Sequence, residues 1–178
     1  MFKKIFNLVF YSKPFILGEK SKVHSSADIS NAGGNKNDIV IGNNTHIKGE
    51  LLLLGHGGQI IIGDYCHVGP NSHIWSGKLI KIGDRVLIGH NCNIFDNDIH
   101  PFDPLMRHEQ FKKIITEGQP KDIKLNDQEV VIEEDVWIGA NVTILKGVKI
   151  GRGAIVGANS LIVKDIPEDT IYAGNPGK

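Results

Sequence analysis

Cysteine is scarce in this sequence, and neither sign of charge is in excess. The 178 residues contain two cysteines, Cys66 and Cys92, with no C-x-x-C spacing, which excludes a disulfide framework and a thiolate zinc site. Two such thiols suit a reducing compartment, so we expect a cytoplasmic protein. The 20 basic and 20 acidic residues cancel, and a chain without a net field has no general attraction for nucleic acid or for an anionic membrane.

Residues 1–11, MFKKIFNLVFY, lack the features of a secretion signal. Their apolar stretch is too short to span a bilayer, and no small-residue cleavage site follows it. Helical spacing predicts a short amphipathic helix with an apolar stripe of Phe2, Ile5, Phe6 and Val9. We expect this helix to cap the open end of the core, and weak association with the inner membrane surface is the alternative. Residues 1–22 are therefore assigned to an N-terminal cap or amphipathic segment, and residues 23–178 to one domain.

Aliphatic residues recur every six positions along most of the chain. The longest unbroken series is Ile132, Ile138, Ile144, Ile150, Val156 and Ile162. A period of six fits neither the 3.6-residue repeat of a helix nor the two-residue alternation of an ordinary strand. It is typical of a solenoid in which three hexapeptides make one triangular turn, and the inward aliphatic residues of successive turns fill a narrow core. Glycines after the inward residues, such as Gly63 and Gly139, permit the tight corners.

These repeats, in which Gly follows an aliphatic residue as in Ile138-Gly139, resemble the hexapeptide repeats of the left-handed parallel β-helix acyltransferases. The likeness covers the chain from about Val23 to Gly177. It implies an all-β fold, a left-handed parallel β-helix with one long excursion loop. The hand comes from the resemblance, because the general preference for right-handed crossovers would give the opposite one.

The repeat lapses over residues 95–131, a segment too long and too polar for an ordinary corner. Long loops in compact folds are usually functional or disordered. This one begins FDNDIHPFDPLMRHE, which gathers Asp96, Asp98 and His100 where the coil opens. Histidine can act as a general base near neutral pH, and a carboxylate on its other ring nitrogen would fix its tautomer. We expect His100 to be the base and Asp96 or Asp98 to orient it; the alternative for His100 is a solvated loop histidine.

The His100-Pro101 pair, followed by Arg107 and by VVIEEDVWIGANVTILKGVKIG, resembles the sugar O-acetyltransferases typified by the maltose and galactoside acetyltransferases. In that family the histidine before proline is the base, although Gly often stands where this chain has Ile99. The Asp-rich approach is similar to that of acetyltransferases acting on bacterial surface polysaccharides. The resemblance implies that Asn71 and Arg107 contact the acceptor sugar, and a simple corner is the alternative role for Asn71.

The stretch from Trp137 to Lys164 resembles the coils that bind acetyl-CoA in these enzymes, where the pantetheine arm lies in a groove between two subunits. Ala140 and Ala158 match small residues whose main chain meets the arm, and Trp137 matches an aromatic residue of the groove wall. Lys164 matches a basic residue near the nucleotide phosphates, and Asn175 lies in an AGNPGK ending similar to one that approaches the adenine. The resemblance implies acetyl-CoA as co-substrate, no metal, and a homotrimer.

Other functions stay open at this point. N-acetylation of an amino sugar, a sugar nucleotide or an aminated antibiotic needs a similar base. A γ-type carbonic anhydrase shares the coil, but no pair among the eight histidines has the five-residue step found between two zinc ligands of that family. A non-catalytic trimeric scaffold would have no need of both a base and a CoA groove.

Overall fold

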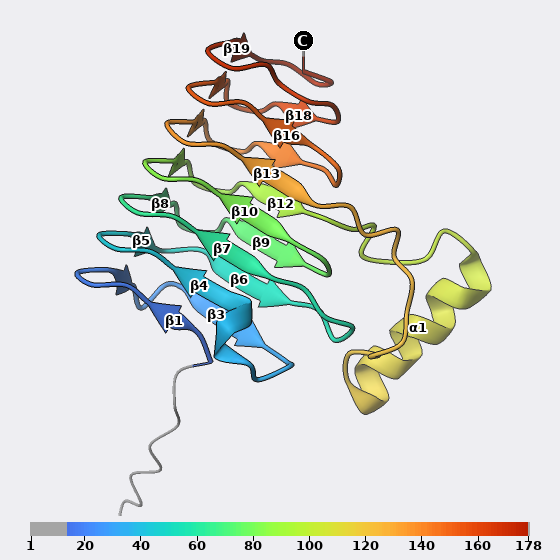
Figure 1. The fold of residues 1–178 in the computed structure, drawn as a ribbon. Helices are drawn as coiled ribbons and strands as arrows, with labels where there is room; N and C mark the ends of the chain where they lie inside the picture. The colour runs from blue at the N-terminus through green and yellow to red at the C-terminus, as the bar shows by residue number, and fades with distance from the viewer. Residues whose placement is uncertain (1–13, 178) are drawn as a thin grey trace, which may run out of the picture.

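Short strands separated by corners wind the chain into a three-sided stack of coils (Figure 1). The computed structural model describes residues 14–177. Strands β1 to β18 fall in turn on three parallel sheets, named A, B and C here. The predicted left-handed parallel β-helix of hexapeptide repeats is confirmed.

The three sheets have six, seven and six strands, and neighbours within each are parallel. Sheet A contains β1 (Ile16–Leu17), β4 (Ile39–Ile41), β7 (Ile60–Ile62), β10 (Ile80–Ile82), β13 (Val130–Ile132) and β16 (Lys149–Ile150). Sheet B contains β2 (Lys22–Val23), β5 (His46–Ile47), β8 (His67–Val68), β11 (Leu87–Ile88), β14 (Trp137–Ile138), β17 (Ile155–Val156) and β19 (Ile171–Tyr172). Sheet C contains β3 (Asp28–Asn31), β6 (Glu50–Leu53), β9 (His73–Ser76), β12 (Asn93–Phe95), β15 (Thr143–Ile144) and β18 (Leu161–Ile162). A 3-10 helix, η1 (Lys36–Asp38), precedes β4.

Inward-facing aliphatic residues of successive coils stack directly on one another. In sheet A, Ile60 pairs in register with Ile80, and Ile80 with Val130. All three side chains are fully buried, and each such burial stabilises the fold by roughly 1.5–3 kcal/mol. The predicted six-residue series is also buried at every position: Ile132, Ile138, Ile144, Ile150, Val156 and Ile162. The six-residue period of the sequence is therefore the period of the core in this part of the stack.

Asparagines at positive φ turn many of the corners. Asn91, Asn141 and Asn159 have φ values of 56°, 59° and 60°, a region that Asn tolerates better than most residues. The Asn91 amide donates to Asn141 Oδ1, and the Asn141 amide donates to Asn159 Oδ1, at 3.1 Å in both cases. These three side chains form a ladder along the corner between sheets B and C.

The excursion leaves the stack after β12 and returns at β13. Its base is closed by a hydrogen bond from Gln128 N to Asp96 O at 2.7 Å. Because β10 pairs directly with β13, with Ile82 opposite Ile132, the coils continue in register across the interruption. The excursion was expected to be a loop, and this expectation is wrong in part, because it contains a helix standing beside the stack, α1 (Pro104–Glu117) (Figure 1).

Local signals define both ends of α1. Asp103 is the N-cap, where its side chain accepts from Met106 N at 2.8 Å, and Pro104 occupies the first turn. Gly118 ends the helix at φ 95°. These residues suit helix ends because they satisfy free backbone groups or adopt a positive φ.

The coil begins with β1, earlier than the boundary expected at Val23, because Ile16 pairs with Val40 in sheet A. The amphipathic helix predicted near the N-terminus lies outside the described residues. No helix in the described part of the chain is long and apolar enough to cross a membrane.

Candidate active site

The excursion covers part of the outer face of sheet C, and His100 lies where the two meet. Between them is a partly enclosed cavity of about 100 Å³. Leu52 and Trp75 line it from the sheet, and Ile114 and Leu125 line it from the excursion. His100 and Gln110 supply polar groups to the same cavity, so a titratable side chain faces a mostly apolar space.

Gln110, rather than an aspartate, contacts the His100 ring. His100 Nδ1 lies 2.7 Å from Gln110 Oε1, and Gln110 Nε2 donates to Ile99 O at 3.1 Å. Among the described residues, none is hydrogen-bonded to His100 Nε2. The prediction that Asp96 or Asp98 orients the ring is wrong in this structure, because both carboxylates are bonded elsewhere.

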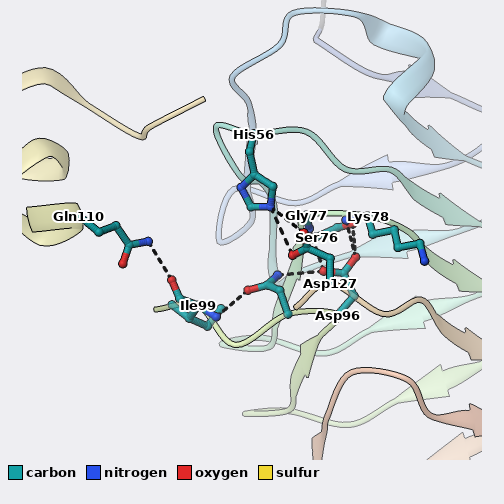
Figure 2. A network of polar contacts seen from close by, with 9 residues as sticks. His56, Ser76, Gly77, Lys78, Asp96, Ile99, Gln110 and Asp127 are labelled. Atoms are coloured by element: carbon teal, nitrogen blue, oxygen red, sulfur yellow. Dashed lines mark hydrogen bonds and ion pairs between the residues drawn. The ribbon is translucent and has the colours of Figure 1, made fainter. Parts of the chain in front are cut away.

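Asp96 is a buried bridge between coils. Its carboxylate accepts from Ser76 Oγ at 2.6 Å, Gly77 N at 2.8 Å and Lys78 N at 2.9 Å, as Figure 2 shows. Asn97 Nδ2 donates to it as well, at 2.8 Å. Asp96 is fully buried, so these donors replace the water it has lost.

Asp98 ties the excursion to the stack. Its carboxylate forms an ion pair with Lys146 and accepts from Asn126 Nδ2 at 2.8 Å. Asp98 O also accepts from His100 N at 2.6 Å. Asp98 therefore supports the segment that carries His100 through its backbone, while its side chain joins both ends of the excursion to the coil after β15.

The two expected acceptor residues lie apart from this cavity. Arg107, on α1, donates to Pro101 O at 3.3 Å and to Phe102 O at 3.1 Å, which shapes the turn after His100. Asn71 is an exposed corner residue with φ 57°. It lines a separate open pocket of about 270 Å³ beside His73, whose Nδ1 is 2.8 Å from Glu50 Oε2. One chain alone does not bring Asn71 and His100 together.

The expected cofactor residues lie on the C-terminal coils. Trp137, half-exposed, pairs in register with Ile155 on the next coil of sheet B. Ala140 and Ala158 stack at the following corner, where Asn159 N donates to Ala140 O at 2.9 Å. Trp137, Ala140 and Ala158 therefore form one surface strip.

The remaining two expected cofactor residues lie at the last coils. Lys164 Nζ lies 5.9 Å from the centre of the Tyr172 ring. Asn175 is exposed in the turn between Gly174 and Gly177. Both lie beyond the strip formed by Trp137, Ala140 and Ala158, toward the C-terminus.

Neither cysteine is placed to act as a nucleophile. Cys66 and Cys92 are buried, and burial raises the pKa of both thiols, which disfavours the reactive thiolate. Within residues 14–177, no three His, Cys, Asp or Glu side chains cluster closely enough to hold a metal ion. The groups available for proton transfer at the cavity are therefore imidazoles.

The family follows from comparison with known proteins. Residues 129–164 match the model described as bacterial transferase hexapeptide (six repeats). The Saccharomyces cerevisiae protein named "Putative acetyltransferase YJL218W" is 32% identical over 165 residues, which cover 89% of this chain and 77% of that protein. The chain belongs to the hexapeptide-repeat acetyltransferases.

Two bacterial relatives of this acetyltransferase carry more specific names. The galactoside O-acetyltransferase of Lactococcus lactis is 32% identical over 76% of the chain, and the Escherichia coli "Putative lipopolysaccharide biosynthesis O-acetyl transferase WbbJ" is 37% identical over 68% of it. The aligned part spans 59% of each of these relatives.

Two solved structures share the fold of the acetyltransferase. A hexapeptide-repeat acetyltransferase of Vibrio cholerae complexed with acetyl coenzyme A is 28% identical, with a TM-score of 0.53 over 91% of this chain and 67% of that one. AntD, an N-acyltransferase of Bacillus cereus in complex with dTDP-4-amino-4,6-dideoxyglucose and coenzyme A, is 23% identical, with a TM-score of 0.72 over 93% and 82%.

Gln110 and His56 are site residues that sequence reasoning missed. His56 Nε2 lies 3.3 Å from Asp127 and lines the cavity beside His100. No motif marks either residue. The only signal for Gln110 was the pair of helix ends at Asp103 and Gly118, which would have placed it within a helix following His100.

Proposed function

We propose that this acetyltransferase transfers an acetyl group from acetyl-CoA to a hydroxyl group of a sugar in bacterial surface polysaccharide biosynthesis, with His100 as general base. The observation that carries the proposal is the state of the His100 ring, whose Nδ1 is bonded and whose Nε2 has no partner among the described residues. An imidazole held through one nitrogen offers the other as a proton acceptor.

The chemistry needs no covalent enzyme intermediate. His100 Nε2 takes the proton from the acceptor hydroxyl as its oxygen attacks the thioester carbonyl carbon. The carbon–sulfur bond then breaks, and the CoA thiolate takes up the proton from the imidazolium. A backbone N–H would stabilise the oxyanion formed in between. Direct transfer is consistent with the burial of both thiols.

The donor fits the strip formed by Trp137, Ala140 and Ala158. Two alanines at adjacent corners leave the backbone accessible, as an extended thiol arm requires, and the half-exposed Trp137 supplies an apolar wall. Lys164 lies farther along the stack, where it would meet phosphate, and Asn175 would lie near the adenine. The Vibrio cholerae structure with acetyl coenzyme A supports this choice of donor. We further propose a cytoplasmic homotrimer, with the donor groove between subunits.

N-acetylation of an amino sugar or sugar nucleotide is the second candidate. The AntD structure favours it, because that N-acyltransferase matches 93% of the chain in fold. The galactoside O-acetyltransferase and WbbJ favour the hydroxyl. Matched acceptors with a hydroxyl or an amine at the same ring position, compared by the kcat/KM of CoA release and by mass spectrometry of the product, decide between the two.

Replacement of His100 tests the base directly. His100→Asn is expected to lower kcat by about 10²–10⁴, the usual contribution of a general base. His108→Asn is the matched control, because His108 is an exposed histidine on α1. A folded, trimeric His100→Asn enzyme with turnover within a few-fold of the parent would overturn the assignment.

Replacement of Ala158 tests the donor groove. Ala158→Trp is expected to abolish the rise in melting temperature that acetyl-CoA gives the parent, because the bulky ring fills the groove. Ser25→Trp places the same ring on an exposed corner of the first coil and is expected to leave the rise intact. An unchanged acetyl-CoA shift in Ala158→Trp would refute the donor placement.

A further inference from the structure

We propose that Gln110 is a positioning residue that holds His100 in the tautomer with hydrogen on Nδ1, so that Nε2 is the base. The inference rests on the proposed function and deepens it. From the sequence, an aspartate is expected to orient the His100 ring, and this role falls instead to the neutral amide of Gln110 on α1.

Hydrogen-bond polarity fixes the direction of the Gln110 amide. Ile99 O can only accept, so the group 3.1 Å from it must be the NH₂ of Gln110. The amide oxygen then faces His100 Nδ1 at 2.7 Å. Because an amide oxygen can only accept, Nδ1 must carry the hydrogen, which leaves the lone pair of the neutral ring on Nε2.

The burial of Gln110 sets it apart from the rest of its helix. It is the one buried residue of α1 and is 5% exposed. A buried amide is costly unless its groups are bonded, and here both ends of the amide are used at the His100 segment. An apolar residue would fill the same position at lower cost if packing were its only purpose. The contact with the His100 ring therefore explains why a polar side chain occupies this buried position.

The charged and titratable side chains near His100 form their contacts with residues other than His100. Asp98 forms an ion pair with Lys146, and His56 Nε2 lies 3.3 Å from the Asp127 carboxylate. Arg107 donates to backbone carbonyls of the turn. No described carboxylate contacts the ring, so Gln110 directs the imidazole without favouring its protonated form as a carboxylate would.

Three variants test this role. Gln110→Met keeps the length of the side chain but removes the acceptor, and Gln110→Glu restores an acceptor that carries charge. Gln59→Met makes the same change at an exposed glutamine outside the cavity, whose side chain makes no hydrogen bond in the described structure. Each is measured as the folded full-length oligomer, for kcat, for the KM of acetyl-CoA, and for the nitrogen-15 shifts of the His100 ring.

We expect Gln110→Met to lower kcat by about ten- to a hundredfold, less than the loss of the whole base, with an unchanged KM for acetyl-CoA. Its ring nitrogens should show a mixture of tautomers where the parent shows one. Gln110→Glu should recover much of kcat at high pH, and its acid limb should move up by about one pH unit, because a carboxylate stabilises the imidazolium. Gln59→Met should match the parent.

A single tautomer and parental kcat in Gln110→Met would overturn the inference, as would a Gln110→Glu enzyme with the parental pH profile. These failures are distinct from failure of the proposed function. If His100→Asn is inactive while Gln110→Met is unaffected, His100 remains the base and only the positioning role falls. If His100→Asn is active, the base assignment falls first.

Discussion

Ser76 Oγ lies 2.6 Å from Asp96 Oδ2, so two neighbouring coils of sheet C are joined through a fully buried carboxylate. The same carboxylate receives the amides of Gly77 and Lys78. An acidic residue four positions from the proposed base therefore stabilises the opening of the coil and does not contact the ring.

Asp96→Ala is expected to destabilise the protein strongly. It leaves two buried donors, on Ser76 and Asn97, and two partly buried backbone amides without a partner, which together cost about 2–4 kcal/mol of unfolding free energy. Asp122→Ala removes an exposed carboxylate of the excursion and should change stability little. Urea unfolding measures both, and equal midpoints for the two variants would show that the carboxylate does not bridge the coils.

Lys146→Met is expected to loosen the excursion while the coils stay intact. Asp98 would keep only Asn126 as a side-chain partner, and this partly buried ion pair contributes about 1–2 kcal/mol. Amide hydrogen exchange should quicken over residues 97–126 and stay slow in β7 and β10. Lys81→Met, at an exposed lysine on β10, is the control. Unchanged exchange in the excursion would contradict the anchoring role.

The asparagine ladder predicts that two small residues at position 141 destabilise the protein by different amounts. Asn141→Ala loses both ladder hydrogen bonds and leaves an apolar side chain at φ 59°, without the local hydrogen bonding that lets Asn adopt this conformation, at a cost of about 1–2 kcal/mol. Asn141→Gly loses the same hydrogen bonds but adopts this φ without strain. Thermal unfolding should therefore rank the parent first, the glycine variant second and the alanine variant last. A more stable alanine variant would show that backbone conformation does not control this corner.

Two histidines at sheet B, His24 and His67, predict a loss of stability in acid. His24 Nε2 lies 3.3 Å from His46 Nδ1, and His46 pairs in register with His67. Partial removal from water, and then Lys22, lowers the pKa of His24. Loss of hydration, and then Lys48, lowers the pKa of His67. Below about pH 6.5, the usual histidine value, the unfolded chain binds more protons than the folded one, so stability falls as the pH falls.

Lys48→Gln should make this loss smaller, because Lys48 acts on both histidines whose pKa is lowered. Lys81→Gln, on sheet A, should leave the acid dependence as it is in the parent. Melting temperatures at pH 7.5 and on the acid side of the histidine range compare the three proteins. Identical acid losses in all three would exclude charge repulsion in this cluster as the cause.

The coils could be predicted from the sequence because most of their sides bury an aliphatic residue at the same position of the repeat. Ile138, Ile144 and Ile150 are all fully buried, and their spacing is visible without a structure. Several corners follow for a similar reason, since Asn tolerates the positive φ found at Asn91, Asn141 and Asn159. Gly63 and Gly139 do not have a positive φ, and their lack of a side chain instead allows close contact with the next coil. The spacing of the aliphatic residues and the asparagine corners are local features of the sequence, so both can be predicted without knowing the tertiary contacts.

Helix α1 escaped prediction because it has almost no buried face. Its one buried residue is Gln110, so the apolar spacing that identifies a helix is missing. Asp103-Pro104 and Gly118 mark its ends, but such signals also occur in turns. Such a helix is stabilised by its capping residues and by a few side chains that line the cavity. The spacing of apolar residues in the sequence does not reveal these contacts.

The partners of His100 escaped prediction because closeness in sequence did not give contact. Ile99 adopts φ 62° between Asp98 and His100, which turns the chain so that the aspartate reaches Lys146 instead. Gln110 meets the ring only because α1 folds back over it. Acidic residues near a histidine are thus a weak guide to its hydrogen bonds, and the geometry of the return segment decides them.

The hydrogen bond from Gln128 N to Asp96 O has a consequence for how such proteins diversify. It brings the two ends of the excursion together at one point of the stack, while β10 and β13 pair as though nothing lay between them. The entropic cost of closing a loop rises only slowly with its length, so the length of the excursion has little effect on the stability of the coils. We expect that longer, shorter or differently folded segments could replace it between β12 and β13 without changing the strand pairing of the core.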